Sequence, residues 1–150
     1  MCRKGGRTLN ILVVDDESIQ VETISRGLKS KGYRVTEAMN ADEALGKINK
    51  VGARIDMVIT DYSMPGMNGL ETFKVIHRID PKLPAIIMTA FGNTETAIEA
   101  TKLGAFDYVL KPFEIPDMLG IIQQALEAGR FMRSPVAMTV QPFGTVRLTR

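Results

Sequence analysis

Two patterns of hydrophobic and polar positions alternate along most of the chain. Short apolar runs, typical of buried strands, are separated by longer segments whose apolar residues recur at helical spacing. The apolar runs predict strands at residues 10–14, 33–38, 57–60, 85–88 and 106–110. The longer segments predict helices over 17–31, after Asn40, over 70–79, from Asn93 or Thr94 to Gly104, and from about Pro116.

Strict alternation of strands and helices predicts an α/β fold. The connections between strands are far longer than hairpin turns, so the strands are expected to be parallel, with helices on both faces of the sheet. Five such units in about 120 residues favour a flavodoxin-like (βα)5 doubly wound sandwich with a five-stranded parallel sheet. The pattern covers residues 9–129, and residues 1–8 and 130–150 lie outside it. Residues 1–8 are interpreted as a basic arm, and residues 130–150 as a basic, flexible tail, with a swapped pair of strands as the alternative.

The charge of the chain is segregated. The 150 residues carry a formal net charge of +2, yet residues 1–8 contribute +3 and residues 130–150 contribute +4, with no acidic residue in either. Residues 9–129 keep the other 12 basic and all 17 acidic residues, a net charge of −5. An acidic body argues against general nucleic-acid binding, so no direct DNA binding is expected.

The chain contains one cysteine and one histidine, and these low numbers argue against several classes of site. Cys2 is the only cysteine, which excludes an internal disulfide and a multi-cysteine zinc site. His77 is the only histidine and is interpreted as a surface residue. A single histidine argues against histidine-rich metal sites and histidine-dependent catalytic triads. No signal peptide or membrane span is apparent, so we expect a cytoplasmic protein.

Chemically informative side chains follow four of the predicted strands. They are Asp15 and Asp16 after the first strand, Asp61 after the third, Thr89 after the fourth and Lys111 after the fifth. Ligands of open parallel sheets bind at the carboxyl ends of the strands, so these groups are expected to converge. Singly, each is an ordinary turn former, helix cap or solvated residue.

Three converging carboxylates repel one another, and a bound divalent cation relieves the repulsion. Oxygen ligands without histidine or cysteine favour Mg²⁺, with Mn²⁺ as the alternative. A carboxylate beside such a cation, an ammonium and a hydroxyl is suited to accepting a phosphoryl group. The chain has no glycine-rich nucleotide-binding motif, so a nucleotide is not the expected ligand.

Four motifs in the right order resemble one known family. They are Val13-Val14-Asp15-Asp16-Glu17, the run from Asp61-Tyr62-Ser63-Met64-Pro65 to Gly69, Met88-Thr89-Ala90, and Lys111-Pro112-Phe113. Together they resemble the receiver domain of two-component response regulators, the CheY-like family, over residues 9–129. The Phe106-Asp107-Tyr108 run makes the resemblance greatest to receivers of the NtrC and FixJ type.

The resemblance implies a role for each site residue. Asp61 would be the phosphoacceptor, and Thr89 and Lys111 would bind the phosphoryl oxygens. Asp16 and Asp61 would ligate Mg²⁺ directly. Asp15 would act mostly through water, and Ser63 would offer its backbone carbonyl. Tyr108 would be the switch aromatic, turning inward as Thr89 moves, and the Lys111-Pro112 bond would be cis.

Two further positions are expected to set the lifetime of the phosphorylated state. Ser63 and Phe91 stand two residues beyond Asp61 and Thr89 and would border the path of a hydrolytic water. A bulky apolar Phe91 should hinder that water. The chain would therefore catalyse its own phosphorylation and a slow autodephosphorylation without being a conventional enzyme.

The expected partners follow from the same resemblance. A sensor histidine kinase or a phosphotransfer protein would supply the phosphoryl group, and a downstream protein would read the switched surface. A homodimer through the face between the fourth strand and the fifth helix is a further expectation. The residues after Gly129 are too few for an effector domain, and no membrane partner is expected.

Two alternative functions are open at this point. A pseudo-receiver would bind partners without phosphorylation, although the full set of Asp15, Asp16, Asp61, Thr89 and Lys111 argues against it. A phosphohydrolase of the HAD kind also uses an aspartate nucleophile with Mg²⁺. Its nucleophile follows the first strand in an Asp-x-Asp pattern, which this chain lacks.

Overall fold

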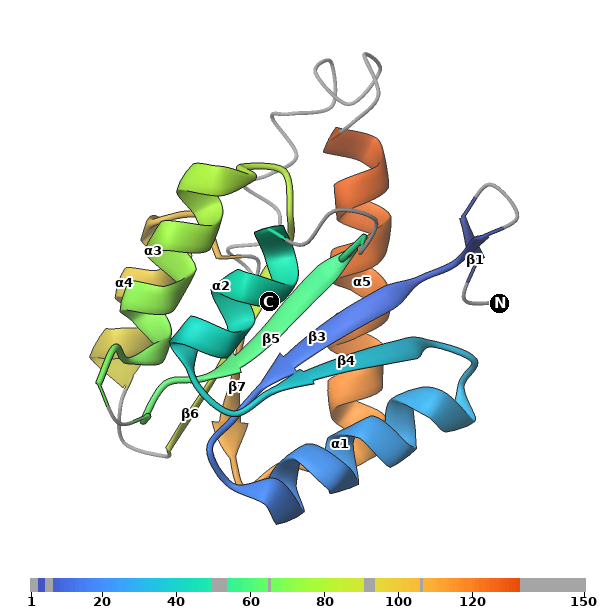
Figure 1. Cartoon of the computed structure of the whole chain (residues 1–150), viewed down its shortest axis with the longest axis horizontal. Helices are drawn as coiled ribbons and strands as arrows, with labels where there is room; N and C mark the ends of the chain where they lie inside the picture. Colours follow the sequence, from blue (N-terminus) through green and yellow to red (C-terminus); the bar gives the residue numbers. More distant parts are fainter. Residues whose placement is uncertain are drawn as a thin grey trace.

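Five strands form one parallel sheet at the centre of the molecule. The computed structural model describes residues 3–4, 7–49, 54–64, 66–90, 94–105 and 107–132. The strands lie in the order β4-β3-β5-β6-β7, and all four neighbouring pairs are parallel (Figure 1). Their bounds are β3 (Asn10–Val14), β4 (Arg34–Ala38), β5 (Met57–Asp61), β6 (Ala85–Ala90) and β7 (Asp107–Lys111). The predicted flavodoxin-like fold is confirmed.

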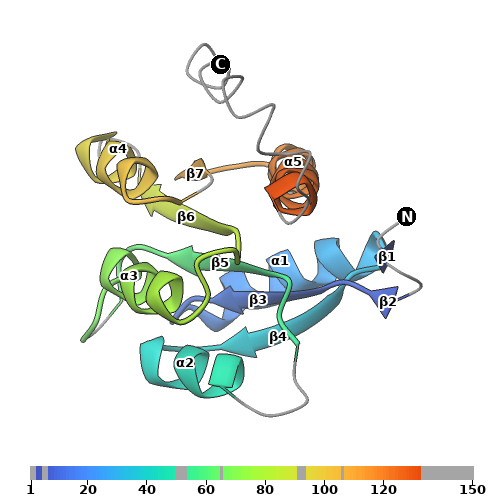
Figure 2. The same cartoon turned by 90° about the horizontal axis from the view of Figure 1, so that it is seen from above.

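Five helices cover the two faces of the sheet. They are α1 (Ser18–Ser30), α2 (Ala41–Asn49), α3 (Gly69–Ile79), α4 (Thr94–Lys102) and α5 (Ile115–Met132). Figure 2 shows α1 and α5 along one face and α2, α3 and α4 along the other. Helix α5 continues three residues past Gly129. Within the described ranges, none of the helices is both long and apolar enough to cross a membrane.

The central strands explain why the strand prediction succeeds. Every residue of β3 and of β5 is buried, since each strand is covered by helices on both sides. The edge strands β4 and β7 are only partly buried and accordingly carry more polar residues. Burial on both faces produces the continuous apolar runs seen in the sequence.

A short hairpin precedes the sheet and was not predicted. Strands β1 (Arg3–Lys4) and β2 (Arg7–Thr8) pair antiparallel, where the sequence was interpreted as an unpatterned basic arm. Two-residue strands are too short to show an alternation of apolar and polar positions. The Gly-Gly pair between them in the sequence is a hairpin signal that the apolar pattern does not register.

A polar cluster fixes the sheet at the amino ends of its strands. The Asn10 backbone N–H donates to Asp56 Oδ2 at 2.8 Å, and the Asp56 N–H donates to the Asn10 carbonyl at 2.8 Å. The Asn10 side chain donates to the Arg54 carbonyl and accepts from Thr36 Oγ1. Asn10 thereby fixes β3 against both of its neighbours, at the edge opposite to the predicted site.

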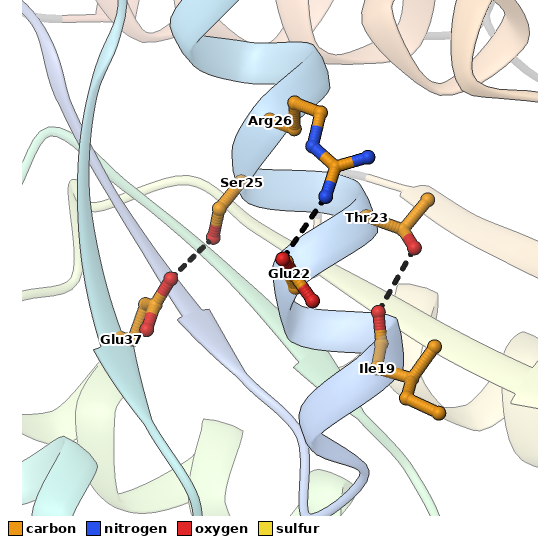
Figure 3. Close-up of polar contacts among 6 residues, drawn as sticks. All are labelled: Ile19, Glu22, Thr23, Ser25, Arg26 and Glu37. Atoms are coloured by element: carbon orange, nitrogen blue, oxygen red, sulfur yellow. Dashed lines mark hydrogen bonds and ion pairs between the residues drawn. The ribbon is translucent and has the colours of Figure 1, made fainter.

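A partly buried polar contact joins helix α1 to the sheet. Ser25 Oγ donates to Glu37 Oε2 of β4 at 2.8 Å (Figure 3). On the outer face of the helix, Arg26 and Glu22 form an exposed ion pair, and Thr23 Oγ1 donates to the Ile19 carbonyl. Exposed pairs of this kind contribute little, so α1 is held chiefly by its buried residues.

The helix caps agree with the sequence in part. Asn40 Oδ1 accepts the Glu43 N–H at 2.9 Å, which confirms Asn40 as the cap of α2. In a standard capping box the Glu43 side chain would accept the Asn40 N–H, whereas here it accepts the Met39 N–H. The cap still satisfies two backbone donors at the start of the helix.

Phe73 lies on the inner face of α3 and is 1% exposed, so its truncation should destabilise the fold. We expect Phe73→Ala to lower the free energy of unfolding by about 3–5 kcal/mol, measured by urea denaturation, because it leaves a cavity. Ile79→Ala is the control on the same helix, since Ile79 is 44% exposed, and it should change stability by only about 0.5 kcal/mol. Equal effects of the two changes would contradict this account of the core.

Candidate functional site

The carboxyl edge of the sheet brings the predicted site residues together. Asp15 directly follows β3, Asp61 ends β5, Thr89 is the penultimate residue of β6, and Lys111 ends β7. Because these four strands are consecutive neighbours in the sheet, residues up to 96 positions apart along the chain meet at one edge. The expected convergence is confirmed for these residues and for Asp16.

Three carboxylates form the centre of the site. Asp15, Asp16 and Asp61 each offer an oxygen, and these oxygens lie within 4.8 Å of one another. Asp15 and Asp61 are buried, whereas Asp16 is exposed to solvent. The Glu17 N–H donates to Asp15 Oδ1 at 3.1 Å, which orients that carboxylate.

Lys111 bridges the two buried carboxylates. Its Nζ lies 2.5 Å from Asp61 Oδ1 and 3.9 Å from Asp15 Oδ2. The Lys111-Pro112 peptide bond that follows is cis, as expected. Lys111 thus places one positive charge against two buried negative charges.

Burial dominates the ionisation of these groups. Loss of hydration raises the pKa of Asp15 to about 6; the Glu17 N–H opposes this shift, and the nearby charge of Asp61 reinforces it. Burial likewise raises the pKa of Asp61, although Lys111 opposes the change. For Lys111, burial lowers the pKa, but the hydrogen bond and charge of Asp61 outweigh it and leave the pKa raised. The carboxylates are therefore destabilised in their charged form.

Two buried oxygens at the site have no hydrogen-bond partner among the residues that the structure describes. They are Asp15 Oδ2 and Thr89 Oγ1. Buried polar atoms are normally paired, so two unpaired ones at one edge of the sheet call for an explanation such as a bound ligand, ion or water. A carboxylate oxygen suits a cation and a hydroxyl suits an anionic oxygen, so the donor set fits both Mg²⁺ and a phosphoryl group.

The other predicted residues occupy different environments. Ser63 is exposed, two residues beyond Asp61, and Tyr108 is half-buried in β7. Phe91 lies outside the described residues, so its predicted role is untested.

The interpretation of His77 as a surface residue is wrong. His77 is half-buried, its Nδ1 is buried without a hydrogen-bond partner among the described residues, and its ring packs 5.2 Å from that of Phe73. The glycine at position 104 explains the difference, because a Cβ there would lie 3.1 Å from His77 Cε1. The ring fills space that a side chain at position 104 would otherwise occupy, far along the sequence from His77.

Comparison with known families identifies this arrangement. Residues 11–123 match the model of the response regulator receiver domain. The chain belongs to this family. The acidic triad of Asp15, Asp16 and Asp61 is typical of the magnesium site of receiver domains, and the receiver of a response regulator is a phosphorylation-switched module.

Individual relatives agree with the family assignment. The transcriptional regulatory protein ZraR of Klebsiella oxytoca is 38% identical over 142 residues, which cover 94% of this chain and 32% of that protein. The DNA-binding transcriptional regulator NtrC of Proteus hauseri is 35% identical over 84% of this chain and 26% of that protein. The predicted resemblance to NtrC-type receivers is therefore confirmed. The chain spans about a third or less of the length of these curated relatives.

A solved structure supports the same conclusion for the fold. A response regulator receiver domain protein from Clostridium thermocellum is 35% identical and superposes with a TM-score of 0.78. The match covers 83% of this chain and 98% of that one. The receiver architecture thus extends over the whole five-stranded sheet.

One residue that contacts the site was missed by the sequence analysis. Gly69 begins α3 and lies against the backbone of Asp61 and Tyr62. In the sequence it is one of several glycines in a loop, and no spacing rule marks it as different from Gly66. Only the three-dimensional path of the loop reveals the contact.

The raised carboxylate pKa values of this receiver predict how its stability depends on pH. Between the ordinary pKa of 3.8 and the folded value of about 6, the folded state keeps a proton on Asp15 that the unfolded state has released. The stability of the metal-free protein should therefore fall as the pH rises through this window, and the Asp61 shift acts in the same direction. Mg²⁺ should raise the melting temperature more at about pH 8 than at about pH 5, measured by calorimetry.

Asp15→Asn removes one of these buried charges and should raise the melting temperature of the metal-free receiver at about pH 8. The same change should reduce the stabilisation by Mg²⁺. Asp42→Asn, at an exposed position in the first turn of α2, is the control and should not raise the melting temperature. A lower melting temperature for Asp15→Asn at this pH would contradict the assignment of burial as the dominant effect.

Proposed function

We propose that this receiver accepts a phosphoryl group on Asp61 from a histidine of a sensor kinase or of a phosphotransfer protein. The observation that carries the proposal is the placement of the Asp61 carboxylate 2.5 Å from Lys111 Nζ, within a cluster of three acidic residues. Carboxylates act as phosphoryl acceptors when neighbouring groups offset the charge of the transferred group. We include a cytoplasmic location in this proposal.

The transfer forms one bond and breaks one. An Asp61 carboxylate oxygen attacks the phosphorus, and the phosphorus–nitrogen bond of the phosphohistidine breaks. The imidazole leaves with the electron pair of that bond and takes up a proton from solvent. Lys111 then faces the phosphoryl oxygens, and Thr89 Oγ1, which is buried without a partner among the described residues, donates a hydrogen bond to another of them.

The acidic residues are proposed to hold the metal that this transfer requires. Asp16 and Asp61 would be direct ligands, the Ser63 carbonyl a third, and Asp15 would act mostly through water. Mg²⁺, or Mn²⁺ in its place, supplies positive charge that offsets the charge on the phosphoryl oxygens. Only oxygen atoms are offered by these groups, in agreement with either ion.

Tyr108 is proposed to pass the change on to a protein-binding surface. In the register of β6 and β7, Thr89 pairs with Leu110 and Ile87 pairs with Tyr108. Since side chains two residues apart share a face, Thr89 and Tyr108 stand on the same face of adjacent strands. A downstream protein or a second copy would read the surface that runs from β6 across the edge strand β7 to α5, and no direct DNA binding is proposed for these residues.

Phosphorylation by acetyl phosphate tests the proposal. We expect incubation with acetyl phosphate and Mg²⁺ to increase the intact mass by one phosphoryl group. Asp61→Asn should abolish the increase because it removes the nucleophile, and omission of Mg²⁺ should also abolish it. Asp80→Asn, at the end of α3, is a control that should be phosphorylated like the wild type.

Lack of a mass increase in the wild-type chain would overturn the phosphoacceptor assignment and favour a pseudo-receiver. The phosphohydrolase alternative has lost its support, since the family assignment accounts for the same residues. Turnover of a general phosphatase substrate by sub-stoichiometric protein would be needed to restore it.

The side chain at position 91 predicts the lifetime of the phosphorylated state. If the bulky ring of Phe91 hinders the hydrolytic water, Phe91→Ala should dephosphorylate faster than the wild type. The measurement is the loss of the phosphorylated mass with time after removal of acetyl phosphate. A decay no faster than that of the wild type would show that Phe91 has no such role.

A further inference from the structure

Gly69 is packed against the backbone of the residue proposed to be phosphorylated. It is the first residue of α3 and is buried. A Cβ built on it would collide with the Asp61 carbonyl oxygen and would lie 2.7 Å from Tyr62 Cα and 2.8 Å from the Asp61 carbonyl carbon. All three atoms belong to the backbone, so a side-chain rotation cannot relieve the collision.

Position 69 requires glycine because there is no room for a side chain, not because of its backbone conformation. The glycines with a left-handed backbone among the described residues are Gly32, Gly66 and Gly104, and Gly69 is not one of them. Any residue can therefore adopt the backbone conformation of Gly69, but no side chain fits there. Gly46 in α2 is the opposite case, because a Cβ there would meet nothing within 4 Å.

Hydrogen bonds hold both segments that meet at Gly69, the end of β5 and the start of α3. The Gly69 N–H donates to the Tyr62 carbonyl at 2.8 Å, and the Tyr62 N–H donates to the Met88 carbonyl of β6 at 2.7 Å. On the helix side, a capping box fixes the first turn of α3. Asn68 Oδ1 accepts the Glu71 N–H at 2.9 Å, and Glu71 Oε1 accepts the Asn68 N–H at 3.0 Å. Tyr62, which follows β5, is therefore hydrogen-bonded both to β6 and to the first residue of α3.

We propose that Gly69 is a positioning residue for Asp61: by letting the capped start of α3 lie directly on the Asp61 backbone, it sets where the carboxylate stands relative to Lys111 and the metal ligands. The inference rests on the proposed function of Asp61. It assigns α3 a task in the reaction, although α3 contributes no side chain to the acidic cluster described above.

The size of the displacement explains why the reaction should be sensitive to it. Ordinary Cβ contacts begin at 3.4 Å, so an alanine at position 69 must move away from Tyr62 Cα by about 0.7 Å, and further from the Asp61 carbonyl oxygen, which is the closest of the three atoms. Reacting groups have to be held to within about 0.5 Å, and a misplacement of about 1 Å costs up to about a hundredfold in rate.

The test compares Gly69→Ala with two control variants in the full chain. The readouts are the initial rate of phosphorylation by acetyl phosphate, the Mg²⁺ affinity by calorimetry, and the melting temperature. We expect Gly69→Ala to slow phosphorylation by about tenfold to a hundredfold and to weaken Mg²⁺ binding. Gly46→Ala controls for the loss of a helical glycine and should react like the wild type.

Leu83→Ala controls for a general loss of stability. Leu83 is buried just before β6, near the amino ends of the strands and far from the acidic cluster. This variant should melt at a lower temperature while keeping a phosphorylation rate within about twofold of the wild type. Equal losses of rate in Gly69→Ala and Leu83→Ala, or a wild-type rate in Gly69→Ala, would overturn the proposal.

A second pair of variants decides the question if Gly69→Ala does not fold. Asn68 and Asn40 are matched caps, each accepting the N–H of a glutamate three residues on at 2.9 Å. Asn68→Ala loosens the helix that lies on Asp61 and should slow phosphorylation, whereas Asn40→Ala loosens α2 and should not. Equal rates for the two variants would overturn the proposal, and an unreactive wild type would instead show that the proposed function is wrong.

Discussion

Burial of the Asp15 and Asp61 carboxylates side by side determines what the carboxyl edge of the sheet can bind. The parallel topology brings the ends of β3 and β5 together, and helices on both faces exclude water from them. Loss of hydration raises the pKa of both groups, so their charged forms are costly. In the part of the chain that the structure describes, one ammonium, that of Lys111, lies against these two buried charges. The remaining negative charge would be offset by a divalent cation, in agreement with an acidic triad that is typical of the magnesium site of receiver domains.

The opposite edge of the sheet keeps these charges in register. Asn10 bonds through its backbone and side chain to Asp56, Arg54 and Thr36, which fixes β3 against β4 and the start of β5. A slip of one residue between β3 and β5 would turn every side chain of one strand to the other face. Asp15 and Asp61 would then no longer approach each other. By fixing the register of β3, the polar cluster at the amino ends of the strands also fixes how Asp15, five residues after Asn10, is placed relative to Asp61.

The parts of the molecule that the sequence predicts are those that depend on local pattern and topology. After Asn10, the strand Asn10–Val14 is apolar because it is buried on both faces, and a parallel sheet requires its strand ends to share one edge. Neither rule says how closely α3 approaches Asp61, so the contact of Gly69 could not be predicted. The half-burial of His77 depends on the absence of a side chain at Gly104, and the raised pKa of Asp15 depends on the depth of burial. These features arise from packing between segments that are distant in the sequence.

The unpaired atoms of the site also suggest how binding of a ligand there could affect a neighbouring strand. A chain selected for stability alone would give Thr89 Oγ1 and Asp15 Oδ2 hydrogen bonds, whereas here neither has a hydrogen-bond partner among the described residues, and Lys111 Nζ stands 3.9 Å from Asp15 Oδ2. Groups that are unsatisfied without a ligand gain most when one arrives, so ligand binding is coupled to a rearrangement of those same groups. Thr89 belongs to β6, whose neighbour β7 carries both Lys111 and Tyr108. On the proposed function, a movement of Thr89 and Lys111 toward a phosphoryl group would act on the strand that holds Tyr108.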